Sequence, residues 1–147
     1  MKRLFLTGLV SLVLAVQPAL AVSDLYKTLI GTGFKTRANY TADGNGAAFC
    51  FTDGRPSNFI FNLDADFVSG TSTLDVKVQH SSDSSASAHW KDLATFTQVT
   101  TSDSVQNIHN VDLTTHVQKC LRAVIDVGAA GTPNYNVLVR VMYRNAQ

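Results

Sequence analysis

Hydrophobic and polar residues alternate along much of the chain. The alternation is clearest over residues 74–79, where every second side chain is apolar. A period of two is typical of a β-strand with one buried side and one side in water. Turn-forming serines at 81–85 follow, and Trp90 then opens a further apolar run that ends at Val99. Together these stretches predict a strand, a polar turn and a returning strand.

Further strand-like segments recur at near-regular spacing on both sides of this unit. In one of them, residues 105–113, Ile108 falls out of step with Val105, which predicts a β-bulge. About seven or eight strands separated by turns are typical of an antiparallel β-sandwich or jelly roll. We therefore expect an all-β fold. The remaining predicted strands cover residues 47–51, 58–68, 117–127 and 135–143.

The single tryptophan is expected to anchor the core, because a tryptophan that opens a strand usually packs inward. Trp90 would then contact the apolar sides of the neighbouring strands. The core residues predicted with it are Phe59, Phe61, Val76, Val78, Leu121 and Ile125.

The composition agrees with strands rather than helices. The 147 residues include no glutamate and only two methionines, whereas serine, threonine, valine and asparagine are abundant. Strong helix formers are therefore scarce, while β-branched and turn residues are plentiful. The length suits one domain with a core of its own. A net charge of +1 and singly scattered charges do not indicate a nucleic-acid partner.

The N-terminus has the residue order of a secretory signal. Lys2 and Arg3 precede an apolar run at 4–16, and Ala19-Leu20-Ala21 then offers a cleavage site. The run is too short for a stable membrane span, which takes about 20 residues. The alternative is an apolar arm that stays attached and docks on a partner.

The chain accordingly divides into a signal-like segment at 1–21, a lead-in arm at 22–46 and a β-sandwich domain at 47–147. The lead-in contains the turn-rich sequence NYTADGNG at 39–46. Because it is polar and rich in glycine, we expect it to become ordered only when it binds a partner.

Cys50 and Cys120 are 70 positions apart. In an oxidising compartment a disulfide between them would close one large loop, worth about 4 kcal/mol. In a reducing compartment they would be small buried hydrophobic residues. Neither has a second Cys or a His at the spacing of a metal site. The sequence leaves the disulfide and the free thiols open.

The histidines and serines carry no recognisable catalytic motif. His80, His89 and Asp83 flank the serine-rich turn and would in principle form a small site, but exposed or hydrogen-bonded loop histidines are the simpler interpretation. His109 and His116 are seven positions apart, which is not a metal-ligand spacing. The serines lack the G-x-S-x-G elbow of a nucleophile.

Asp64 and Asp66 would point to the same face of a strand. Such a carboxylate pair is able to bind Ca²⁺ or to act in acid–base catalysis, but solvated surface charges are the simpler interpretation. We therefore expect a non-enzymatic protein without a metal or a cofactor.

One set of segments resembles a known family. Residues 74–83 read LDVKVQHSSD, followed by WKDL at 90–93, FTQV at 96–99 and KCLRAVIDVG at 119–128. They are similar to small structural proteins of tailed bacteriophages, in which a VKIQHS-D strand precedes W-D-L and a later RYLRAVATVGG strand. Gly131-Thr132-Pro133 and the final valine-rich strand also fit. The resemblance covers about residues 35–143.

The resemblance implies a jelly-roll module that decorates or cements a capsid without catalysing a reaction. The expected location is the capsid exterior of a virion, and the expected partner is the major capsid protein. The module would form a homo-oligomer on the capsid and contact the shell with an extended N-terminal arm. The residues expected to touch the partner are Leu4, Phe5, Leu9, Leu12, Leu25, Tyr26, Phe34 and Tyr40.

A second hypothesis is a carbohydrate-binding module that is secreted or periplasmic once the leader is cleaved. The V-Q-x-S-x-D…W unit also resembles discoidin-type sandwiches, whose loops at one end bind glycans. Trp90, His89, Tyr40 or Tyr135 would then form a stacking platform. The N-terminal sequence of the natural protein separates the two hypotheses, since loss of residues 1–21 favours export.

Overall fold

The computed structural model describes residues 25–31, 36–51, 56–84, 89–109, 119–128 and 130–145. Within these residues the regular structure consists of ten β-strands. They are β1 (Leu25–Ile30), β2 (Ala38–Tyr40), β3 (Gly44–Asn45), β4 (Phe49–Cys50), β5 (Pro56–Ser69), β6 (Leu74–Ser81), β7 (Lys91–Thr95), β8 (Ser104–His109), β9 (Cys120–Val127) and β10 (Asn134–Asn145).

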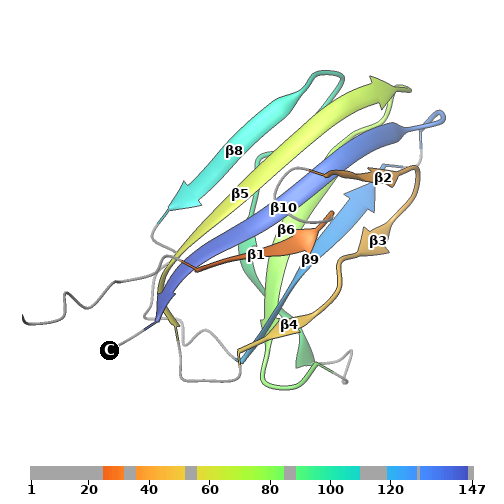
Figure 1. Ribbon diagram of the computed structural model, residues 1–147. Coiled ribbons are helices and arrows are strands. Elements are labelled where there is room, and N and C mark those ends of the chain that lie inside the picture. Colours follow the sequence, from red (N-terminus) through yellow and green to blue (C-terminus); the bar gives the residue numbers. More distant parts are fainter. Residues whose placement is uncertain are drawn as a thin grey trace, which may run out of the picture.

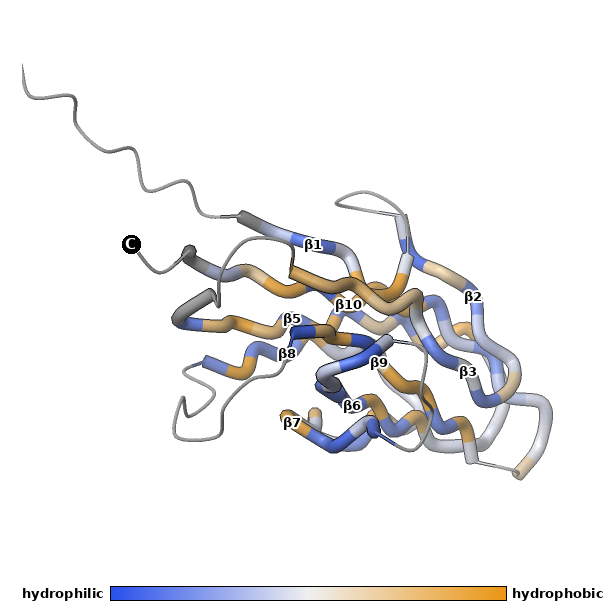
Figure 2. The backbone as a smooth tube through the Cα atoms, turned by 90° about the horizontal axis from the view of Figure 1, so that it is seen from below, coloured by the Kyte–Doolittle hydropathy of each residue, from blue (hydrophilic) through white to orange (hydrophobic). Residues whose placement is uncertain are grey.

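The strands form two antiparallel sheets (Figure 1). The sheet that we call the β8 sheet has the order β1-β10-β5-β8, and β2 also pairs with β10. The sheet that we call the β7 sheet has the order β3-β9-β6-β7, and β4 also pairs with β9. Figure 2 shows them as two layers, with β1 and β10 in one layer and β6 and β7 in the other.

The chain passes between the two sheets in the order of a jelly roll. β1 and β2 share the position beside β10, and β3 and β4 share the position beside β9, so each sheet is four positions wide. After β5 in the β8 sheet, β6 and β7 join the β7 sheet, β8 returns, β9 crosses again and β10 ends in the β8 sheet. Two packed sheets with eight strand positions and such crossovers make a jelly roll. The predicted fold class is therefore confirmed.

The core fills the space between the sheets. Burial alternates along β6, where Leu74, Val76 and Val78 face inward. Phe59 and Phe61 on β5 are fully buried, with stacked rings whose centroids lie 5.9 Å apart. The buried predicted core residues are Phe59, Phe61, Val76, Val78, Leu121 and Ile125. Trp90 is not among the core residues.

The predicted boundary between a lead-in arm and a sandwich at residue 47 is wrong. Residues 25–45 supply β1, β2 and β3, which belong to the two sheets. Leu29 and Ile30 of β1 are each only 2% exposed. Because β2 and β3 have three and two residues, they are too short to show an alternating pattern. The signal-like segment at 1–21 lies outside the described residues.

The bulge predicted near Ile108 is absent from β8. Its pairing with β5 runs without a shift from Ser104 to His109. The regular register turns Ile108 toward the core and Val105 outward, where 69% of Val105 is exposed. An exposed valine, rather than an extra residue, explains why the apolar pattern falls out of step.

The two cysteines form a disulfide. Cys50 on β4 lies directly opposite Cys120 on β9, with 4.0 Å between the Cα atoms. The bond fastens the two-residue strand β4 to the central strand of the β7 sheet.

Candidate interaction surface

The outer face of the β8 sheet begins with a row of apolar side chains. The antiparallel register places Tyr26 opposite Met142, Met142 opposite Ile60, and Ile60 opposite His109. We call Tyr26, Met142 and Ile60 the apolar row. Tyr26 is 48% exposed and Met142 is 38% exposed. The row crosses three neighbouring strands, so these side chains form one continuous strip rather than scattered spots.

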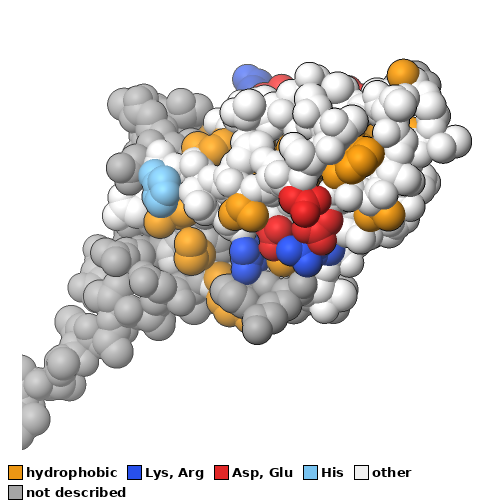
Figure 3. All heavy atoms as spheres, turned by 90° about the horizontal axis from the view of Figure 1, so that it is seen from above, with side chains coloured by type: hydrophobic (Ala, Val, Ile, Leu, Met, Phe, Trp, Pro, Cys, Tyr) orange, Lys and Arg blue, Asp and Glu red, His pale blue; other side chains and the backbone are white. Residues whose placement is uncertain are grey.

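All four large hydrophobic residues that are exposed in the described part of the chain belong to the β8 sheet. Tyr26 and Met142 lie in the apolar row, Val68 at the end of β5, and Val105 on β8. Single exposed apolar residues are ordinary on a protein surface, but apolar residues gathered on one face mark a site of interaction. Figure 3 shows several hydrophobic side chains on the side of the molecule that carries β8.

A polar row lies next to the apolar row. Arg140 donates hydrogen bonds from its guanidinium to the side-chain oxygen of Asn62, and Asn62 donates in turn to the side-chain oxygen of Asn107 at 2.9 Å. Asn62 is only 7% exposed although it faces outward. The linked side chains hold one another in place, so the surface beside the apolar row is fixed before any partner arrives.

Arg37 binds both carboxylates of the pair predicted from the sequence. Its guanidinium donates to both carboxylate oxygens of Asp64 at 2.9 and 3.0 Å and forms an ion pair with Asp66 at 3.3 Å. The hydrogen bond that Arg37 donates to Asp64, supported by both negative charges, raises the pKa of Arg37. On this side of the molecule, Figure 3 shows acidic side chains (red) next to basic ones (blue). Both carboxylates are therefore bound to Arg37, and this ion pairing competes with binding of Ca²⁺.

A tight backbone contact covers the centre of the same face. Gly31 has a φ of 97°, and a Cβ there would lie 2.7 Å from Leu138 and 2.3 Å from the carbonyl oxygen of Thr36. Leu138 faces outward on β10 between Asn136 and Arg140, yet it is 1% exposed. Glycine is the residue that tolerates both this φ and this approach. The apolar row, Val68 and Val105 are therefore left as the open apolar parts of the face.

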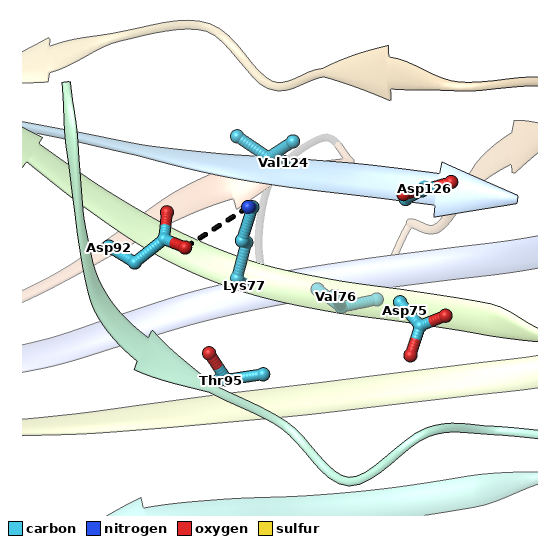
Figure 4. Close-up of a pocket in the computed structure, with 7 residues that line it drawn as sticks. All are labelled: Asp75, Val76, Lys77, Asp92, Thr95, Val124 and Asp126. Carbon is cyan, nitrogen blue, oxygen red and sulfur yellow. Dashed lines mark hydrogen bonds and ion pairs between the residues drawn. The ribbon is translucent and has the colours of Figure 1, made fainter.

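The outer face of the β7 sheet is polar by contrast. Asp75 lies opposite Asp126, and Lys77 opposite Val124, around an open hollow of about 220 Å³ (Figure 4). Lys77 donates to Asp92 at 3.1 Å. Asp92 also accepts a hydrogen bond from Gln79 at 2.7 Å, and that bond, together with Lys77, lowers the pKa of Asp92.

Trp90 belongs to this polar face and not to the core, which corrects the prediction. The guanidinium carbon of Arg122 lies 4.4 Å from the centre of its indole ring. Arg122 in turn donates two hydrogen bonds to Gln79. Trp90 is half-buried and stands just before β7, whose apolar contact with the core comes from Leu93 and Ala94 instead. A cation–π contact with an outward arginine gives the indole a partner outside the core.

The other residues of the proposed glycan platform do not gather around Trp90. Tyr135 is fully buried, and its hydroxyl lies 2.5 Å from the carbonyl oxygen of Ser72 and 3.0 Å from that of Thr100. Burial raises the pKa of Tyr135. Tyr40 lies on β2, in the other sheet, where it packs against the core. Only His89, which is exposed beside Trp90 in the sequence, remains near it.

The described histidines do not form a metal site. His80 is 4% exposed, and burial, with a smaller effect from Lys91, lowers its pKa. His89 and His109 are exposed, and His116 lies outside the described residues. Across the part of the chain that the structure describes, no three His, Cys, Asp or Glu residues are grouped so as to hold a metal ion.

Of the residues predicted to touch a partner, Tyr26 is the one that the structure places on the apolar row. Leu25 begins β1, and Tyr40 is half-buried. Sequence reasoning missed Val68, Val105 and Met142. Val105 had one signal, its apolar side chain out of step with Ile108. The predicted residues outside the described part are Leu4, Phe5, Leu9, Leu12 and Phe34.

No protein-family model matches the chain, and no curated protein matches it significantly. Among the described residues, no helix has the length and apolar character needed to cross a membrane.

Proposed function

We propose that this protein is a non-enzymatic decoration or cement protein of a tailed-bacteriophage capsid, and that it docks on the major capsid protein with the outer face of its β8 sheet. The observation that carries the proposal is the one-sided surface. Tyr26, Val68, Val105 and Met142 are exposed on one sheet of the sandwich, whereas the described part of the other sheet carries no exposed large hydrophobic residue. A module that lies flat on a shell needs one such face.

Three further features support this function. The jelly roll is the fold of many viral capsid domains, although lectin domains also use it. The segments at 74–99 and 119–128 resemble small structural proteins of tailed phages. The Cys50–Cys120 disulfide suits a protein exposed at a virion surface, where disulfides persist.

The size of the chain sets how it would bind. A specific, stable interface buries about 800 Å² on each partner. The apolar row alone is too narrow for that area, so the contact would extend over the polar row and toward Val105. The ordered hydrogen bonds of Arg140 and Asn62 favour this, because a surface that is already fixed loses little entropy on binding.

The experiment that tests the function is cosedimentation of the purified chain with capsids of the phage that encodes it. We expect the native chain to sediment with the particles. Met142→Lys places a charge in the apolar row and should weaken binding by about tenfold or more, since an unpaired charge would be buried. Thr95→Lys makes the same charge change at an exposed position on β7 and should bind like the native chain.

Two outcomes would overturn the proposal. If the native chain does not sediment with the particles, the protein is not a decoration protein. If the Met142→Lys and Thr95→Lys variants bind with equal affinity, the β8 sheet is not the docking face.

A second function, glycan binding, is favoured by the outward position of Trp90. The indole stacks on Arg122, which donates to Gln79, and Gln79 donates to Asp92. Such a polar network beginning at an aromatic ring suits the recognition of a sugar. In this case the natural protein would be exported without residues 1–21. A glycan array answers the question directly: a bound glycan that the Trp90→Ala variant no longer retains would support this function, and no bound glycan would exclude it for the sugars tested.

A further inference from the structure

β8 is an exposed edge strand without a single charged residue. It contains Ser104, Val105, Gln106, Asn107, Ile108 and His109, and in the described part of the chain it is paired with β5 alone. Figure 1 shows it as the outermost strand of its sheet. Its far side therefore presents a row of backbone N–H and C=O groups, which is a template for pairing with another strand.

The other edge strands are protected in ways that proteins commonly use. β7 carries Lys91 and Asp92, and β1 carries Lys27. Charged side chains on an edge oppose strand addition, and so do edges only two or three residues long. The latter describes β2, β3 and β4. β8 is thus the one described edge that is both six residues long and uncharged.

The edge is also held in a fixed position. The side-chain amide of Gln106 donates to the carbonyl oxygen of Thr97 and accepts from its N–H, both at 2.8 Å. Gln106 also donates to the hydroxyl of Ser104 at 2.9 Å. These bonds tie β8 to the segment that follows β7, so the strand does not need to become ordered in order to pair.

We propose that β8 pairs antiparallel with β8 of a second copy of this chain across a two-fold axis. A two-fold axis places the residues of one strand against those of an identical strand, so any charge would face its own sign. A strand without charge avoids this repulsion. We therefore assign the pairing partner of β8 to a second copy of this chain. Val105, 69% exposed, gains an apolar contact in the pair.

The alternation of side chains limits the register. Val105, Asn107 and His109 face outward on β8, and a continuous sheet keeps outward residues opposite outward residues. Pairing centred on Asn107 joins five residues of each strand and sets Val105 against His109 of the other copy. The two Asn107 amides then meet on the axis, where each is able to donate to the other.

This pairing deepens the proposed function, on which its biological consequence rests. A two-fold axis perpendicular to the sheet keeps the outer faces of both β8 sheets on the same side. Two apolar rows would then face one capsid surface, and two linked docking sites bind more tightly than one. The pairing itself does not depend on the capsid and is measured without it.

The first test is a cysteine cross-link in the full-length chain. Residues directly opposite in an antiparallel pair have Cα atoms about 4.5–5.5 Å apart, within the range of a disulfide. The Asn107→Cys variant should therefore form a disulfide-linked dimer through position 107 under mild oxidation. The control, Val105→Cys, faces His109 of the other copy and should remain monomeric on a non-reducing gel. Absence of the Asn107→Cys dimer, or equal cross-linking of both variants, would overturn the pairing.

The second test is sedimentation equilibrium over a range of concentrations. The native chain should reach twice the monomer mass, and Asn107→Lys should weaken the dimer by about tenfold because two lysines meet on the axis. Ser102→Lys adds the same charge at an exposed position before β8 and should dimerise like the native chain. A native chain that stays monomeric would overturn the pairing. An Asn107→Lys monomer that still binds capsids would leave the proposed function in place.

Discussion

The outer faces of the two sheets differ although the inner faces share one core. On the β8 sheet, the apolar row is open to solvent beside a hydrogen-bonded polar row. On the β7 sheet, no described residue is an exposed large hydrophobic side chain, and polar side chains bind one another, as in the pairs Lys77–Asp92 and Gln98–Asp75. One face thus leaves large apolar side chains exposed, whereas the described part of the other face exposes polar groups. This difference is our reason for proposing the β8 sheet as the docking face.

The largest expected effect on the free energy of unfolding comes from comparing a core aromatic residue with a surface aromatic residue. Phe59→Ala removes a fully buried ring and should lower the free energy of unfolding by about 3–5 kcal/mol. Trp90→Ala removes a half-buried ring stacked on Arg122 and should cost about 1 kcal/mol. Urea unfolding of both variants measures the contrast. Equal losses would mean that Trp90 supports the core after all.

The disulfide should stabilise the whole domain while lying in the β7 sheet alone. Replacing both Cys50 and Cys120 by alanine reopens a loop of 70 residues and should lower the free energy of unfolding by about 4 kcal/mol in the chain-entropy model. The check is guanidinium unfolding of the double variant beside the native chain without reductant. A loss below about 1 kcal/mol would show that the bond adds little to the jelly roll.

These comparisons also show how far the sequence predicts the structure. The long strands β5, β6, β9 and β10 follow from period-two alternation, since each has at least eight residues. The two-residue strands β3 and β4 lack that signal, and they are defined by pairing with distant β9. Trp90 was misplaced because a half-buried stack on Arg122 depends on Gln79 and β9, which no local pattern reveals.

The candidate surface was harder to predict than the fold. Tyr26 is predicted to touch a partner because it lies in the expected N-terminal arm, whereas the sequence pattern assigns Met142 and Ile60 only to strands. Only the pairing of β1 with β10 and of β10 with β5 brings these three side chains into one row. The sequence contains no local signal that residues so far apart in the chain become neighbours, so the row follows only from the pairing of the strands.

His80 should make stability depend on pH through the inner side of the β7 sheet. Its pKa is lowered in the fold by burial and by Lys91, relative to about 6.5 in the unfolded chain. The unfolded chain therefore takes up the proton first as the pH falls. Stability from the neutral imidazole is fully present above about pH 6.5 and is lost as the pH falls toward the folded pKa.

Two measurements check this linkage. An NMR titration of the His80 ring should give a pKa below that of a free histidine. The fall in unfolding free energy between pH 7.5 and 5.5, about one unit on either side of the free value, should shrink in the His80→Gln variant. An unchanged pH dependence in that variant would assign the effect to other groups.

The smallest effect is expected at the ion pairs of the β8 sheet. Arg37→Ala removes the bonds to Asp64 and Asp66, but about a third of the Arg37 side chain is exposed, at 34%. Exposed pairs contribute about 0–1 kcal/mol, so thermal unfolding should shift only slightly and less at high salt. A large loss of stability would mean that Arg37 is needed to hold β2 against the sheet.

Hydroxyl-radical footprinting of the free and the particle-bound chain tests whether the β8 sheet, and not the β7 sheet, faces the capsid. Tyr26 and Met142 report on one face and Trp90 on the other, and all three side chains are readily oxidised. On particles, oxidation of Tyr26 and Met142 should fall sharply while that of Trp90 stays at the free level. Protection of Trp90 with no change at Tyr26 and Met142 would contradict the account.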